Sequence, residues 1–231
     1  MGIQAPVATE LQERKEVRLR MTYEEFLDWS DEDTHAEWVN GEVTVFMPPK
    51  NIHQVVLGFL YHLMRLFVDL FDPGELRVAP FEMKAKPGGS SREPDILFVK
   101  TENRHRINEY RLQGAADLVV EIVSTESVTR DKRDKLQEYA EAGVPEYWIV
   151  DPRSRKQEAR FYRLTEQGLY ELFGSEQDEW IASHVLPGFR LRPAWLWQAE
   201  SLNPLTCALQ IPGVVAQLAQ QIEQAQRDGT E

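Results

Sequence analysis

The sequence has few of the features that mark secreted or membrane proteins. It contains a single cysteine, Cys207, which excludes an internal disulfide and fits a reducing compartment. Its first residues hold no apolar core of signal-peptide length, and no stretch approaches the roughly 20 apolar residues of a membrane span. We therefore expect a soluble, cytoplasmic protein that does not bind membranes.

Positive charge is also scarce. The 231 residues include 26 Lys and Arg against 38 Asp and Glu, so the formal net charge is −12. This balance argues against broad, non-specific adhesion to nucleic acid, although it leaves room for a local basic groove. Carboxylates are also what a metal-dependent phosphodiesterase gathers around its metal. Apolar residues make up 42% of the chain, enough for the core of one domain with extensions.

The first third of the sequence carries clear local signals. Thr22 opens a capping box at the start of a short helix in "MTYEEFLDWS". Asn40-Gly41 predicts a hairpin turn within "AEWVNGEVTVFMPP". A long amphipathic helix follows in "NIHQVVLGFLYHLMRLFVDLFDPG", where Pro73-Gly74 ends it.

Strands and helices then alternate. We predict strands in "ELRVAPFEMKA", "PDILFVK", "DLVVEIVS" and "VPEYWIVD", a helix or turn in "RINEYRLQGA", and a helix in "TRDKRDKLQEYAEAG". The segments "QEARFYRL", "GLYELFG", "DEWIAS" and "HVLPGF" predict an antiparallel meander. Because a hairpin comes first and a meander last, the fold class is a mixed α/β sheet rather than a doubly wound parallel one.

The chain divides into three predicted regions. Residues 1–20 form a charged, loosely held N-terminal extension, and residues 21–198 form the main domain. Residues 199–231 form a helical extension, in which "PGVVAQLAQQIEQAQRDG" predicts an amphipathic helix with a thin apolar stripe.

Two carboxylates stand at unusual places in the predicted strands. Asp95 opens the apolar run in "REPDILFVK", and Glu121 lies inside "DLVVEIVS". A carboxylate is costly to bury unless something binds it. If the two strands are neighbours, the acids converge, and both stay ionised only when a cation neutralises them. Mg²⁺ takes such oxygen ligands. The alternative for Asp95 is a turn cap at the strand end.

Three further residues can join these acids. Glu37 lies in the hairpin, His53 lies at the start of the long helix, and Lys135 lies on the helix after the Glu121 strand. A helix packed on the sheet would bring its ammonium group back to the acids. Simpler roles stay open for all three: Glu37 pairs across the hairpin, His53 is an ordinary helix-start residue, or Lys132 or Arg133 takes the place of Lys135.

Four segments together resemble a known family. They are "HAEWVNGEV", "PDILFV", "LVVEIVS" and "KLQEYAEAGVPEYWIVDP", and in this order they are similar to the Uma-type restriction endonucleases, a branch of the PD-(D/E)XK nuclease superfamily. The resemblance covers roughly residues 20–197. It implies a restriction-endonuclease-like core, which is a mixed, curved β-sheet flanked by helices, with acids on two neighbouring strands and a lysine nearby.

The resemblance also implies a set of catalytic residues, which are Glu37, His53, Asp95, Glu121 and Lys135. Asp95 matches the aspartate of the "PD" half, and Glu121 matches the acid of the second half. The superfamily usually has its lysine two residues after that acid, where this chain has Val123. Lys135 is therefore the natural candidate for a lysine that has moved.

The implied mechanism is hydrolysis of phosphodiester bonds in DNA by a Mg²⁺-dependent endonuclease, with Mn²⁺ able to substitute. The expected metal ligands are Asp95, Glu121, Glu37 and the backbone carbonyl of Ile122. Lys135 would orient the attacking water or stabilise the transition state, and His53 would contact a phosphate or carry protons. Lys86 and Arg92, beside a loop before Asp95, would contact backbone phosphates, and the "TRDKRDK" segment supplies a second local basic cluster. Many nucleases of this superfamily are dimers, so we expect a homodimer.

Two other classes of function stay open. An inactive nuclease fold would act as a binding or regulatory module, through oligomerisation or an unidentified protein partner, and would show no metal affinity. An oligomeric interaction protein would use residues 199–231 as its working part. Deleting that tail would then abolish assembly while the core stays folded.

Overall fold

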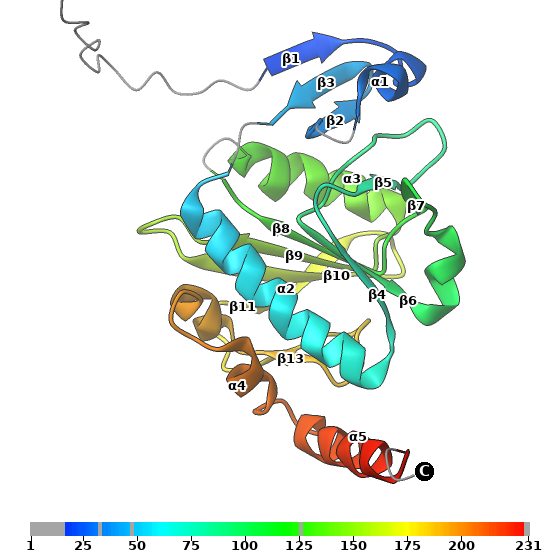
Figure 1. Cartoon of the computed structure of the whole chain (residues 1–231). Coiled ribbons are helices and arrows are strands. Elements are labelled where there is room, and N and C mark those ends of the chain that lie inside the picture. The colour runs from blue at the N-terminus through cyan, green and yellow to red at the C-terminus, as the bar shows by residue number, and fades with distance from the viewer. Residues whose placement is uncertain (1–16, 32–33, 47–48, 125–126, 229–231) are drawn as a thin grey trace, which may run out of the picture.

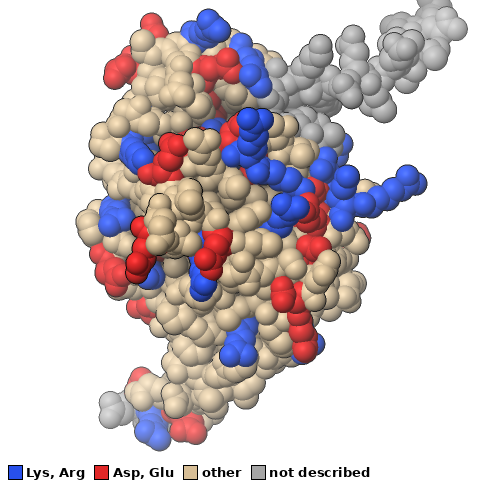
Figure 2. Space-filling model, turned by 180° about the vertical axis from the view of Figure 1, so that it is seen from behind, with Lys and Arg blue, Asp and Glu red and all other residues tan. Residues whose placement is uncertain are grey.

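The structure is a computed structural model that describes residues 17–31, 34–46, 49–124 and 127–228. A central sheet lies between helices on its two faces, a small lobe sits at one end, and C-terminal helices lie at the other (Figure 1). Seen from behind, Lys and Arg side chains gather in the upper right part of the surface (Figure 2).

The central sheet has the strand order β11-β10-β9-β8-β6-β4. Its strands are β4 (Gly74–Val78), β6 (Ile96–Lys100), β8 (Leu118–Ile122), β9 (Glu146–Asp151), β10 (Glu158–Leu164) and β11 (Tyr170–Ser175). Strands β8 and β9 are parallel, while the other neighbours in this sheet are antiparallel. The predicted mixed α/β class is therefore confirmed. Of the four segments predicted as one antiparallel meander, the first two form β10 and β11 of this sheet, while the last two lie outside it.

The two faces of β8 pack against different helices. Leu118, Val120 and Ile122 belong to the larger core, which α2 (Asn51–Phe71) covers. Val119 and Val123 belong to the smaller core, together with Tyr139 of α3 (Lys135–Ala142). Because side chains alternate between the faces of a strand, Glu121 lies on the α3 side.

Helix α2 has the length and composition of a membrane-spanning helix, contrary to the expectation that no such stretch exists. Val56, Leu60, Leu63 and Met64 are nevertheless fully buried in the larger core. A core helix passes the same test of length and composition. The helix ends at Asp72, whose φ is 48°, directly before the predicted stop.

The small lobe confirms the strongest local predictions. It contains α1 (Tyr23–Trp29) and a sheet of order β1-β3-β2, formed by β1 (Val17–Arg20), β3 (Glu42–Val45) and β2 (Ala36–Val39). Thr22 and Glu25 form the capping box, and Asn40 and Gly41 have φ of 50° and 85°, as the hairpin turn requires. The sequence places β1 in a loose extension, but the strand instead pairs with β3.

Two predicted segments divide differently in the structure. The pattern of "ELRVAPFEMKA" predicts one strand, but the segment forms β4 and β5 (Glu82–Lys84), because Pro80 has no N–H to continue the ladder. The prediction for "RINEYRLQGA" is a helix or turn. The segment instead includes the end of a 3₁₀ segment (η1, Thr101–Arg106) and all of β7 (Arg111–Gln113), which pairs in parallel with β5.

The C-terminal elements pack beside α2. Strands β12 (Ile181–Ala182) and β13 (Arg190–Leu191) form their own pair, with "HVLPGF" as the connection. They are followed by η3 (Pro193–Gln198), α4 (Pro204–Ala208) and α5 (Val214–Asp228). Helix α5 confirms the predicted helix. Cys207 of α4 and Ile211 lie in the larger core. The boundaries after residues 20 and 198 stay predictions, and residues 1–16 and 229–231 lie outside the described part.

Candidate active site

Neighbouring strands bring Asp95 and Glu121 together. Strands β6 and β8 are antiparallel, with Ile96 opposite Val120, so Asp95 comes beside Glu121 at the next position of each strand. The Asp95 carboxylate is held in place because its Oδ2 accepts a hydrogen bond of 2.6 Å from the backbone N–H of Ile122. The sequence-based expectation that these two acids converge agrees with this geometry.

Helix α3 returns Lys135 to the same place. Its Nζ lies 2.8 Å from Glu121 Oε1 and 3.1 Å from Glu37 Oε1. The hydroxyl of Tyr139, one turn later, donates to the same Glu121 oxygen at 2.8 Å. Lys135 is only 3% exposed. Of the three cations considered from the sequence, Lys135 is therefore the one at the acids.

The other two cations lie elsewhere. Lys132 contacts Asp151, the last residue of β9, and Glu158 of β10 instead of the two acids, and Arg133 is exposed to solvent. Val123, at the usual position of the superfamily lysine, is buried in the smaller core.

Glu37 forms an ion pair with a second cation, Arg92, rather than with a neighbour across the hairpin. Arg92 Nη1 lies 2.8 Å from Glu37 Oε2, and Arg92 Nε donates to Glu138 Oε2 at 3.1 Å. The sequence predicts that Arg92 contacts phosphates, but this expectation is wrong because its side chain is bound on two sides and the residue is 5% exposed. Lys86, from the same prediction, is exposed.

His53 lies in the first turn of α2 and contacts Asp95. Its Nε2 is 3.2 Å from both carboxylate oxygens. Burial lowers the pKa of His53, but the hydrogen bond and charge of Asp95 outweigh it and hold that pKa above its ordinary value. His53 Nδ1 is buried and has no hydrogen-bond partner among the described residues. The five predicted side chains thus form two contact groups, His53 with Asp95 and Lys135 with Glu121 and Glu37, which lie at the neighbouring strands β6 and β8 and their partners and which we together call the network.

The network holds more negative than positive charge. Burial raises the pKa of Glu121 to about 8, with Asp131 and Glu37 adding to the rise and Lys135 opposing it. Burial alone would raise the pKa of Glu37, but Lys135 and Arg92 lower it to about 2. Burial would lower the pKa of Lys135, yet the surrounding carboxylates hold it above its ordinary value, so Lys135 stays an ammonium ion.

Asp131 is a buried acid that sequence reasoning missed. It is 2% exposed, and its Oδ1 lies 3.5 Å from Lys135 Nζ without accepting a hydrogen bond from any described residue. It lies on a π-helical turn (η2, Arg130–Asp134) directly before α3, a feature often found at functional sites. Asp131 lies four residues before Lys135, and this helical spacing is the feature of the sequence that could have indicated a contact between the two. The basic residues around Asp131 instead make the segment look exposed to solvent.

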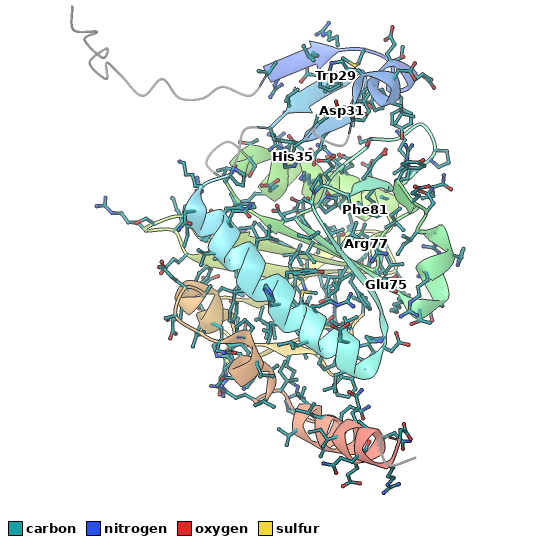
Figure 3. All side chains as sticks on the ribbon, viewed as in Figure 1. Trp29, Asp31, His35, Glu75, Arg77 and Phe81 are labelled. Carbon is teal, nitrogen blue, oxygen red and sulfur yellow. The ribbon has the colours of Figure 1, made fainter. Side chains whose placement is uncertain are left out.

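The small lobe meets the main domain at the edge of this network. His35, labelled in Figure 3, lies at that junction, and its Nε2 is 3.2 Å from Glu93 Oε2. Burial and the neighbouring Glu37 raise the pKa of Glu93 to about 8. The side chain of His35 is 43% exposed, whereas those of Glu37, Glu121 and Lys135 are almost fully buried.

The donor types fit a magnesium ion, although the ligand set is small. Among the residues that the structure describes, no three His, Cys, Asp or Glu side chains form a group ready to hold a metal. Asp95 and Glu121 supply two carboxylates, and Mg²⁺ commonly takes one or two from the protein and completes its shell with water and phosphates. Glu37 is already engaged by Lys135 and Arg92.

A cavity of about 1150 Å³ lies apart from this network. Tyr23, Trp38, Lys84 and Arg111 are among its lining residues. Trp38 follows Glu37 directly in β2, and consecutive strand residues point to opposite faces. The cavity and the carboxylates therefore lie on opposite sides of β2.

The fold and the acid–lysine network define a restriction-endonuclease-like protein. The family model Uma2, described as "Putative restriction endonuclease", matches residues 23–194, and the chain belongs to this family. The resemblance found in the sequence is thus confirmed.

One solved structure shows the same fold. It is that of "a putative nuclease belonging to DUF820" from Anabaena variabilis, which is 17% identical, with a TM-score of 0.63. The match covers 78% of this chain and 99% of that one. No curated protein matches the chain.

Proposed function

We propose that this protein is a Mg²⁺-dependent endonuclease that hydrolyses phosphodiester bonds in DNA. The observation that carries the proposal is the contact of 2.8 Å between the Lys135 ammonium and Glu121, on the strand beside Asp95. Membership of a family described as a restriction endonuclease supports the class of reaction.

Asp95 and Glu121 would hold the metal, for which Mn²⁺ would substitute. When bound, the ion would lower the pKa of a water molecule and neutralise charge on the phosphate. Glu37 lies between Lys135 and Arg92, so its main role would be to hold the ammonium in place. A direct bond from Glu37 or from the Ile122 carbonyl to the metal stays a prediction.

Lys135 would stabilise negative charge rather than accept a proton. Its raised pKa keeps it charged, and a buried ammonium acts strongly on a phosphoryl oxygen in a site of low dielectric. His53 would orient Asp95 through Nε2 and offer Nδ1 to a phosphate or water. A cytoplasmic homodimer remains part of the proposal, and a sedimentation measurement would test the dimer.

One observation favours the alternative of an inactive binding module. Lys135 already compensates part of the carboxylate charge, and no three-ligand metal group is present among the described residues. Such a module would keep its fold without a metal and would act through oligomerisation or a partner protein.

Metal titration separates the two proposals. Mn²⁺ and Mg²⁺ are titrated by calorimetry into the wild type, Asp95→Ala and Asp95→Asn, with the exposed Asp134→Asn as the matched control. We expect Mn²⁺ binding to disappear in both Asp95 variants and to persist in the control. Cleavage of supercoiled plasmid with Mn²⁺ should follow the same pattern, while circular dichroism checks folding. Unchanged Mn²⁺ binding in both Asp95 variants, or a wild type that never cleaves DNA, would favour the inactive module.

A further inference from the structure

Charge is distributed unevenly along the chain. Residues 129–134 and 151–160 hold seven Lys and Arg against four Asp and Glu, whereas the rest holds 19 against 34. The loop between β9 and β10 projects at the left of Figure 1 and so lies at the right of Figure 2, where blue side chains extend outward. These two segments of a strongly acidic protein therefore carry a local excess of positive charge.

Ion pairs hold the two segments of this region together. Lys132 of η2 lies 2.9 Å from Asp151 Oδ2 and also contacts Glu158. Asp151 and Glu158 are themselves paired residues of β9 and β10. Helical turn η2 thus lies against the base of the β9–β10 hairpin.

Three cations of the described segments remain unpaired after these contacts. Asp151 and Glu158 neutralise Lys132 and also bind Arg153 and Arg160. Arg133, Arg155 and Lys156, which we call the basic ridge, are exposed. No ion pair or side-chain hydrogen bond joins any of these three to another described residue. Their charge is available to an external anion.

The basic ridge lies at the same edge of the sheet as the carboxylates. Strands β8 and β9 are parallel, with Ile122 beside Val150, and the Val123 N–H donates to the Val150 carbonyl at 2.8 Å. The ends of both strands therefore meet at one edge. Helical turn η2 joins the two places, because Asp131 is buried at Lys135 while Arg133, two residues later, is exposed.

We propose that the basic ridge binds the phosphates of a nucleic-acid strand and leads that strand to Asp95 and Glu121. This inference rests on the proposed function. A phosphodiester backbone is an extended polyanion, and each unpaired cation that meets a phosphate releases counterions and adds affinity. The acidic remainder of the surface repels such a polyanion, so it restricts binding to this edge. Phosphate contacts of this kind position a strand without reading its sequence.

The test compares two variants with equal changes of charge. The first is the triple variant Arg133→Glu, Arg155→Glu and Lys156→Glu. The control is Arg20→Glu, Arg163→Glu and Arg190→Glu, which replaces three exposed cations that have no predicted contact with a phosphate. Binding of fluorescent duplex and single-stranded DNA oligonucleotides, and of a matching RNA, is measured by anisotropy in EDTA at several salt concentrations.

We expect the ridge variant to lose affinity on the order of tenfold or more, and the slope of log K against log salt to fall by about one per removed cation. The control should change little. Equal effects in the two variants, or no binding by the wild type at low salt, would overturn the inference. Plasmid cleavage with Mn²⁺ is measured separately. If the ridge variant cleaves as well as the wild type, the role of the basic ridge is refuted and the proposed nuclease function stands. If DNA binding depends on the ridge but no cleavage occurs, the nuclease function is refuted and the ridge stands as a binding surface.

Discussion

Lys135 is the residue on which the charge balance of the network depends. Its ammonium contacts Glu121, Glu37 and Asp131, all of which are almost fully buried. The sequence made Lys135 a candidate because it lies on the helix after an acid-bearing strand. Asp131 and Arg92 could not be found that way, because a polar residue on a charged helix or loop looks solvated until the tertiary contacts that bury it are known.

Replacing this lysine should destabilise the fold as well as abolish activity. Lys135→Met leaves several buried carboxylates without their cation, a situation that costs about 3–5 kcal/mol. Lys132→Met is the matched control: Lys132 is itself 24% exposed, and its buried partner Asp151 keeps the contact with Arg153, so the loss should be about 1 kcal/mol. Urea denaturation at neutral pH measures both. Equal losses of stability in the two variants would contradict the central place given to Lys135.

Single elements were predictable where the signal is local. The capping box of α1, the turn between β2 and β3, helix α2 and strands β6, β8 and β9 all follow from neighbouring residues in the sequence. The division of 75–85 into two strands and the parallel pairing of β5 with β7 did not, because they depend on which distant segment supplies the hydrogen bonds. The same limit hid β1, whose partner β3 lies beyond α1 and β2.

Two glycines give opposite predictions at the level of the element. A Cβ at Gly74, the first residue of β4, would overlap the backbone oxygen of Val99 and would lie 2.7 Å from the Phe98 ring. Gly74→Ala should therefore destabilise the protein by about 3 kcal/mol through overpacking. Gly58 in α2 has open space around it, so Gly58→Ala should stabilise by about 0.5–1 kcal/mol. Thermal unfolding of both variants checks the signs, and a stabilising Gly74→Ala would refute the packing argument.

At the scale of the whole molecule, the C-terminal region has two parts with different contacts. Cys207, Ala208 and Ile211 are buried in the larger core. Most of α5 is exposed, including Val215 and Ile222. The sequence predicted the helix correctly, but its pattern alone could not tell which part of residues 199–231 packs on the domain.

Truncation should separate these two parts. Ending the chain after Val214 removes mostly exposed residues and should change the free energy of unfolding by less than about 1 kcal/mol. Ending it after Leu202 also removes the buried side chains of α4 and its neighbours, which should cost roughly 4 kcal/mol or more. Urea unfolding measures stability, and light scattering measures mass. If the chain that ends after Val214 already has a smaller mass in solution than the wild type, α5 is responsible for assembly. If the two shortened chains are equally unstable, the proposed difference between the two parts is wrong.

Strand β2, in the hairpin of the small lobe, limits which insertions and deletions the chain can accept during evolution. Glu37 faces the ion-pair network and Trp38 lines the cavity on the other side of β2. Side chains in a strand alternate with a period of two, so a shift of one residue exchanges an acid for an indole on each side. Loss or gain of a single residue within β2 would thus disrupt two places at once. Insertion or deletion of two residues would keep the acid and the indole on their present faces. Related proteins should therefore differ in the length of this strand by an even number of residues.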